Sequence, residues 1–176
     1  MKVSVVIPTR NRSDLVAQAI DCIESQTVPQ DQYEVIVIDN DSKDDTRAVL
    51  EKKARIYSNL KNGSQEKRGA AATRNAGLRM AKGDLILFID DDVQAEPNLI
   101  RGHIEYQQKN PGASVIGSVT IPWGDTHEPF RRYLRDHRLG EEAPHLVVGP
   151  LQGDKLHEVH EHDEADPHHG GQDVQQ

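Results

Sequence analysis

The chain has 176 residues, of which 35% are hydrophobic and 4% aromatic, and its formal net charge is −8. This length suits one domain with a core, and the acidic balance argues against a broad nucleic-acid-binding face. No apolar run is long enough to span a membrane and no secretory leader precedes the first strand, so we expect a cytoplasmic protein without a membrane span.

Strand and helix patterns alternate along the first part of the chain. A continuous β-branched run predicts a buried strand at 3–7. Apolar residues at helical spacing predict a helix that begins at Ser13 and ends before Val28-Pro29. Next come a buried strand at 35–38, a short helix at 44–55, a weak strand at 56–60 and a loop at Asn62-Gly63.

The same alternation continues to residue 121. We predict an alanine-rich helix at 69–80, a strongly apolar strand at 85–89, a helix from Pro97 to Lys109 and a last strand at 113–121. Strands that alternate with helices indicate an α/β fold, with a mainly parallel sheet and helices on both of its faces.

Polar segments follow the strands or lie in the alanine-rich helix: Thr9-Arg10-Asn11, Asp39-Asn40-Asp41, Arg74-Asn75 and Asp90-Asp91-Asp92. Ligands of open parallel sheets gather outside the carboxyl ends of the strands. Three adjacent carboxylates repel each other unless a cation or another partner neutralises them. A divalent ion held by one or two carboxylates plus substrate phosphates is a common solution. A solvated acidic turn or helix cap is the alternative, but five apolar residues directly precede the triplet.

Four longer segments, each of which contains one of these polar segments, resemble the motifs of the inverting family 2 glycosyltransferases of the GT-A fold and occur in the same order. They are Val5-Val6-Ile7-Pro8-Thr9-Arg10-Asn11-Arg12, the segment from Val35 to Thr46, Arg68 to Gly77, and Gly83 to Asp92. The resemblance covers roughly residues 1–121 and implies a Rossmann-like GT-A fold that binds a nucleotide-sugar.

The resemblance also implies a role for each matching residue. Pro8, Thr9 and Arg10 would border the base, Asp39 would accept a hydrogen bond from a uracil-type ring N–H, and Arg74 would approach the diphosphate. Asp90 and Asp91 would hold the ribose or the first metal shell, and Asp92 would ligate Mn²⁺ or Mg²⁺. The chain reads Asp39-Asn40-Asp41-Ser42 where the family often has Asp-Asp-Gly-Ser, which leaves the turn at position 41 open.

The composition changes near Asp125, because eight of the nine histidines and a strong acidic excess follow it. We therefore expect a nucleotide-sugar-binding domain at 1–125 and a divergent or truncated, partly disordered acidic His-rich tail at 126–176. We predict a short helix at 131–139, whereas the segment 157–176 has few residues to bury. The family's catalytic base comes from the second half of its fold. Neither Glu141-Glu142 nor Asp163-Glu164 is a convincing counterpart, so the base is unknown.

The leading hypothesis is a glycosyltransferase domain that uses a UDP-sugar and a divalent metal, with an unknown glycan, lipid or small-molecule acceptor. The alternative is a catalytically inactive remnant that binds nucleotide-sugar without transferring it. A dinucleotide-dependent oxidoreductase would need Gly-x-Gly-x-x-Gly after the first strand, where this chain has Pro8-Thr9-Arg10-Asn11-Arg12.

Overall fold

The computed structural model describes residues 1–117 and 145–148, and its centre is a six-stranded sheet. The strands are β1 (Val3–Thr9), β2 (Tyr33–Asp39), β3 (Leu60–Ser64), β4 (Leu85–Phe88), β5 (Val115–Gly117) and β6 (His145–Val148). The helices are α1 (Ser13–Glu24), the 3-10 helix η1 (Gln30–Gln32), α2 (Thr46–Ile56), α3 (Ala70–Met80) and α4 (Leu99–Lys109). None of the helices described is long and apolar enough to cross a membrane.

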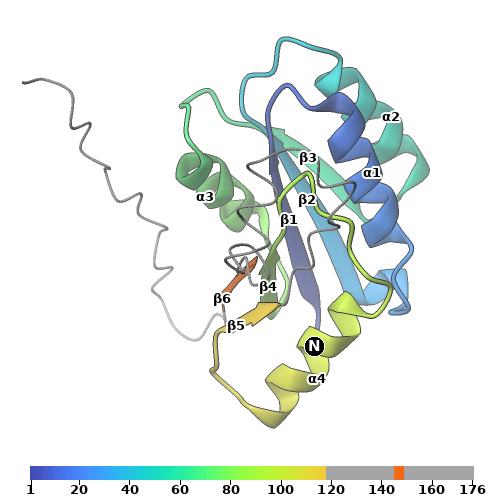
Figure 1. The fold of residues 1–176 in the computed structure, drawn as a ribbon, viewed down its shortest axis with the longest axis vertical. Coiled ribbons are helices and arrows are strands. Elements are labelled where there is room, and N and C mark those ends of the chain that lie inside the picture. The colour runs from blue at the N-terminus through green and yellow to red at the C-terminus, as the bar shows by residue number, and fades with distance from the viewer. Residues whose placement is uncertain (118–144, 149–176) are drawn as a thin grey trace, which may run out of the picture.

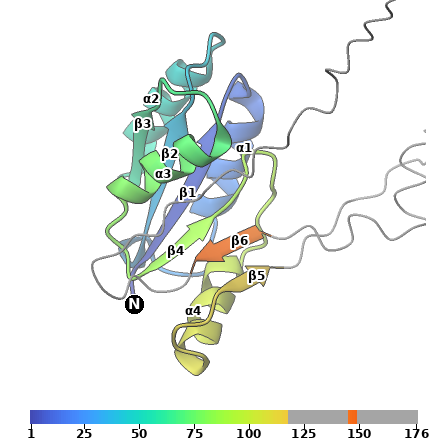
Figure 2. The same cartoon turned by 90° about the vertical axis from the view of Figure 1, so that its left-hand side faces the viewer.

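The strands lie in the order β3-β2-β1-β4-β6-β5 (Figure 1). The first four are parallel, whereas β6 is antiparallel to both β4 and β5. The chain runs outward from β1 through β2 to β3 and then returns to place β4 on the other side of β1. Because such crossovers are right-handed, the returning helix α3 covers the opposite face from α1 and α2 (Figures 1 and 2). The predicted mainly parallel sheet with helices on both faces is confirmed.

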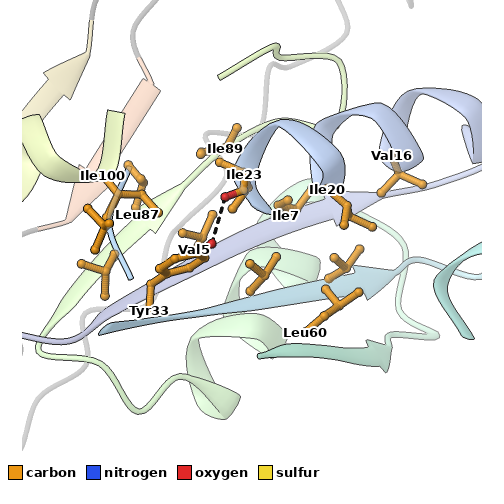
Figure 3. Close-up of a cluster of buried hydrophobic side chains, with 14 of the residues drawn as sticks. Val5, Ile7, Val16, Ile20, Ile23, Tyr33, Leu60, Leu87, Ile89 and Ile100 are labelled. Atoms are coloured by element: carbon orange, nitrogen blue, oxygen red, sulfur yellow. Dashed lines mark hydrogen bonds between the residues drawn. The ribbon is translucent and has the colours of Figure 1, made fainter. Parts of the chain in front are cut away.

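Successive side chains of the central strands enter two different hydrophobic clusters. On β1, Val5 and Ile7 belong to the cluster beneath α1, while Val6 belongs to the cluster beneath α3. Figure 3 shows the first cluster, in which the Tyr33 hydroxyl donates a hydrogen bond to the Ile23 carbonyl at 3.2 Å. The continuous apolar runs in the sequence therefore reflect burial on both faces of the sheet.

Helix α3 lies close to the sheet because a glycine faces β1. A Cβ atom at Gly77 would lie 2.3 Å from Cγ1 of Val6, which is closer than two carbon atoms can approach. Arg74 lies on the same helix, three residues before this contact. The close packing therefore fixes the position of a helix that also borders the candidate site.

Several predicted boundaries are wrong. The third strand is Leu60–Ser64 rather than 56–60, so the predicted loop at Asn62-Gly63 lies inside it, and Ile56 ends α2 with 61% of its surface exposed. This strand carries few apolar residues and pairs with β2 alone, so its sequence shows no strand pattern. Helix α4 begins at Leu99, two residues after Pro97.

Two short elements have no counterpart in the sequence predictions, namely η1 and β6. Strand β6 comes from the segment that was predicted to be a tail. In the sheet it lies between β4 and β5 and pairs with both. Of the predicted last strand at 113–121, residues 113–117 are described, and Val115–Gly117 forms a strand. The predicted helix at 131–139, the acidic pairs Glu141-Glu142 and Asp163-Glu164, and the segment 157–176 lie outside the described residues.

Glu24 gives the fold a pH dependence whose sign can be worked out. Burial raises the pKa of its carboxyl group, and the neighbouring amide of Asn59 together with hydrogen bonds from Gln30 and Tyr33 to Oε2 only partly opposes this shift. Its other oxygen, Oε1, is buried and has no hydrogen-bond partner among the described residues. Because the folded state favours the protonated form, the free energy of unfolding falls as pH rises through this elevated pKa.

We therefore expect Glu24→Gln to raise the free energy of unfolding at pH 8 by roughly 0.5–1 kcal/mol, after allowance for the partial exposure of the group. The difference between variant and wild type should shrink towards pH 4, as Glu24 takes up a proton in the unfolded state as well. Urea denaturation at both pH values measures this. The exposed Glu105→Gln is the control, and a Glu24→Gln difference that does not change with pH would refute the interpretation.

Candidate functional site

A pocket of about 480 Å³ lies where the order of the sheet reverses, at the carboxyl ends of β1 and β4. Ligands of open α/β sheets bind in the crevice at this switch point. The pocket is lined by Pro8, Thr9, Arg10, Arg12, Asn40, Gly69, Ala70, Thr73, Arg74, Asp90, Asp91 and Asp92. Topology therefore brings together residues from the end of β1, the start of α3 and the segment after β4.

Asp91 joins β1 to the segment after β4 across the switch point. Its Oδ2 accepts a hydrogen bond from the Thr9 hydroxyl at 2.7 Å, and its Oδ1 accepts one from Nη1 of Arg12 at 3.0 Å. Asp91 is only 5% exposed, so it needs such partners to remain charged. Both of its carboxylate oxygens are thus engaged by protein groups.

The two flanking aspartates are half exposed and also pair with arginines. Nη1 of Arg12 lies 3.0 Å from Oδ2 of Asp92, and Nη2 of Arg74 lies 2.7 Å from Oδ1 of Asp90. The charge of Asp91, its hydrogen bond and the hydrogen bond to Asp92 together raise the pKa of Arg12. In this structure, arginines supply the neutralisation that three adjacent carboxylates require.

Arg12 pairs with two aspartates, a role that its place in the motif after the first strand does not predict. A cation at that strand end could nevertheless have been matched to the three carboxylates after β4. Its pairing depends on the loop between β1 and α1, in which Asn11 adopts a left-handed conformation with φ 52°. That loop geometry cannot be read from the spacing of the residues.

Asn40 fixes the pocket wall that leads into α3, and this role is not predicted by the sequence either. Its Nδ2 donates to the carbonyls of Gln65 at 2.7 Å and Lys67 at 2.9 Å, and its Oδ1 accepts the Gly69 N–H at 3.1 Å. Gly69 immediately precedes α3, with φ 128°. Asn40 thereby ties the end of β2 to the segment that places the first turn of α3 at the pocket.

Asp39 ends β2 and lies beside this pocket rather than in it. It lines two neighbouring hollows, of about 220 and 430 Å³, both shared with Arg47 and Ser64. Its Oδ1 accepts a hydrogen bond from the Ser42 N–H at 3.1 Å. Asp41 has φ 58°, so the turn takes the left-handed conformation without a glycine, which aspartate tolerates better than most residues.

The structure thus gathers seven of the predicted site residues around one pocket: Pro8, Thr9, Arg10, Arg74, Asp90, Asp91 and Asp92. Asp39 is the exception, and the roles of all eight remain predictions. Within residues 1–117 and 145–148, no three His, Cys, Asp or Glu side chains converge on a metal position. Asp92 fits a site of another kind, in which one or two carboxylates and substrate phosphates share the ion.

Comparison with known proteins decides the family. Residues 4–157 match the family model described as "Glycosyl transferase family 2". The chain belongs to this family. As a family 2 chain it has the GT-A fold that the sequence motifs implied.

Named relatives of this family 2 chain are glycosyltransferases. It is 32% identical over 122 residues to poly(ribitol-phosphate) beta-glucosyltransferase of Bacillus spizizenii, an alignment that covers 68% of this chain and 19% of the relative. It is 33% identical over 147 residues to validoxylamine A glucosyltransferase of Streptomyces hygroscopicus, covering 80% and 33%. The chain therefore spans a third or less of the length of these two relatives.

Solved structures agree with the family 2 fold. Staphylococcus aureus TarS in complex with UDP-GlcNAc aligns with a TM-score of 0.64 and 25% identity, covering 73% of this chain and 37% of that one. A mannosyltransferase from Pyrobaculum calidifontis, solved with GDP-Man and Mn²⁺, aligns with a TM-score of 0.65 and 24% identity, covering 85% and 44%. The second likeness shows the fold alone.

Proposed function

We propose that the chain is the donor-binding part of a glycosyltransferase that uses a UDP-sugar and a divalent metal, Mn²⁺ or Mg²⁺. The observation that carries this proposal is the switch-point pocket, in which arginines and aspartates face each other at the carboxyl ends of β1 and β4. Membership of family 2 and the named glycosyltransferase relatives support it. The whole protein's acceptor, whether glycan, lipid or small molecule, is left open.

The diphosphate is assigned to the side of the pocket formed by α3. Ala70 begins this helix and lines the pocket, and helix amino termini favour anions. Arg74 lies one turn further along, with its guanidinium on Asp90 at 2.7 Å. Guanidinium groups bind phosphate oxygens through paired hydrogen bonds, so Arg74 can exchange Asp90 for a phosphate.

The base is assigned to the hollow beside Asp39. Oδ1 of Asp39 accepts the Ser42 N–H, and among the described residues Oδ2 accepts no hydrogen bond. A free carboxylate oxygen suits a ring N–H, which uracil presents and cytosine does not. The crystal structures of S. aureus TarS with UDP and with UDP-GlcNAc support the choice of a uridine nucleotide.

The metal is assigned to Asp92, whose side chain is 52% exposed. Carboxylates suit Mg²⁺ and Mn²⁺. When bound, such an ion acts as a Lewis acid that neutralises charge on the departing diphosphate. Asp91 takes a different part, because its buried carboxylate already holds Thr9 and Arg12 in place.

The described residues of the pocket offer no unpaired carboxylate that could act as a base for the acceptor hydroxyl. Asp90, Asp91 and Asp92 each accept a bond from an arginine, and Asp39 lies in the neighbouring hollow. We expect this chain to bind donor but to transfer sugar slowly, because a positioned base contributes about 10²–10⁴-fold to such a reaction.

An assay of UDP release tests this expectation. The chain would receive UDP-glucose or UDP-N-acetylglucosamine with Mn²⁺, with and without a broad acceptor mixture. We expect the acceptors to stimulate release by less than about twofold, since slow hydrolysis of the donor needs no acceptor base. Strong acceptor-dependent turnover would contradict this expectation and exclude the inactive-remnant hypothesis. Failure to bind any donor would contradict the proposed function itself.

A further inference from the structure

One nitrogen of Arg12 bonds two carboxylates that differ in how firmly they are held. Nη1 lies 3.0 Å from Oδ1 of Asp91 and 3.0 Å from Oδ2 of Asp92. The side chain of Asp91 is 7% exposed and also bonds Thr9, whereas that of Asp92 is 52% exposed. Asp91 therefore anchors the guanidinium, and the bond to Asp92 is the one that solvent or a ligand can replace.

The charges around the pocket are balanced before any ligand enters. Its lining holds three arginines (Arg10, Arg12 and Arg74) and three aspartates (Asp90, Asp91 and Asp92). A divalent cation alone would have to approach Asp92 beside the guanidinium of Arg12. This guanidinium already bonds Oδ2 of Asp92. A nucleotide diphosphate alone would add negative charge beside the aspartates. The two ligands together leave the balance nearly unchanged.

We propose that Arg12 competes with the divalent cation for Asp92 and thereby makes cation and nucleotide diphosphate bind cooperatively. The diphosphate draws the guanidinium away from Asp92, while Asp91 keeps it in the pocket, and the carboxylate of Asp92 becomes free for the cation. Arg12 is a positioning residue in this scheme. The proposal rests on the proposed function, because it needs a diphosphate and a cation to share the pocket.

The test measures the affinity for Mn²⁺ by the electron paramagnetic resonance signal of the free ion, without nucleotide and with saturating UDP. In the wild type we expect weak binding of Mn²⁺ alone and a gain of roughly 10- to 100-fold with UDP. In Arg12→Gln we expect Mn²⁺ alone to bind about five- to tenfold more tightly, because the competing cation is gone. The gain from UDP should fall accordingly.

A second variant covers the case in which Arg12→Gln leaves Asp91 unpaired and unfolds the chain. The double variant Arg12→Gln/Asp91→Asn removes the buried charge together with its partner, so the net charge of the pocket stays the same. We expect it also to bind Mn²⁺ alone more tightly than the wild type. A rise in this variant cannot come from a change in net charge, and a loss of Mn²⁺ binding would overturn the proposal by showing that Asp91 itself is a ligand.

The matched control is Arg79→Gln, which removes the same charge from an exposed arginine in the last turn of α3, outside the pocket. We expect its affinity for Mn²⁺ alone to change by less than about twofold. An equal rise in Arg79→Gln, or no rise in Arg12→Gln, would overturn the role of Arg12 while UDP binding to the wild type stands. No binding of UDP to the wild type at any Mn²⁺ concentration would instead overturn the proposed function.

Discussion

Replacing Asn40 by aspartate is expected to lower the free energy of unfolding by about 2–4 kcal/mol. The amide nitrogen of Asn40 donates to the carbonyls of Gln65 and Lys67 at 2.7 and 2.9 Å, and the residue is 5% exposed. A carboxylate of the same shape would place an oxygen against both carbonyls. It would then either repel them or take up a proton at a cost.

The loss should also reach the ligand pocket, because Asn40 holds Gly69 at the start of α3. Urea denaturation measures the stability, and UDP affinity in Mn²⁺ reports the pocket wall. Gln108→Glu is the matched control, since it makes the same amide-to-carboxylate change at an exposed residue of α4, away from the pocket. If Asn40→Asp lowered the free energy of unfolding no more than the control does, the hydrogen bonds of Asn40 would not contribute to stability as proposed.

Replacing Asp92 by asparagine is expected to weaken UDP binding in Mn²⁺ by at least about tenfold and to remove most of its dependence on the metal. An amide keeps the shape of the side chain but loses the charge that attracts the ion. Because Asp92 is half exposed and its pair with Arg12 lies at the surface, the stability should change by less than about 1 kcal/mol.

Isothermal titration of UDP at matched Mn²⁺ concentration measures this effect. Asp31→Asn supplies the control, because Asp31 lies in η1 before β2, at the opposite end of the sheet from the pocket. Equal UDP affinity in the wild type and in Asp92→Asn would refute the assignment of the metal to Asp92.

The central strands could be predicted because burial on both faces leaves continuous apolar runs, as at Val35–Ile38. Strand β3 could not, because it lies at the edge and contains Lys61, Asn62 and Gly63. Strand β6 has only four residues, which is too few to show a pattern within a polar segment.

The sequence predicted which residues gather at the site, but it did not predict the ion pairs and hydrogen bonds between them. Parallel topology alone places Thr9 and the three aspartates at one edge of the sheet. Adjacent residues of the triplet nevertheless differ, since Asp91 is buried while Asp90 and Asp92 are half exposed. The sequence motif implies the same role for Asp90 and Asp91, because it does not specify the local backbone after β4 on which the direction of each side chain depends.

Titration of UDP into the wild-type chain, once in Mn²⁺ and once in EDTA, tests the central claim most directly. We predict measurable binding in Mn²⁺ and an affinity at least about tenfold lower in EDTA, because the ion offsets the repulsion between the diphosphate and the aspartates. CDP should bind more weakly than UDP in Mn²⁺, since cytosine has no ring N–H for Asp39. Equal UDP affinity in the two buffers, or no binding in either, would contradict the assignment of this pocket to a metal-bound uridine diphosphate.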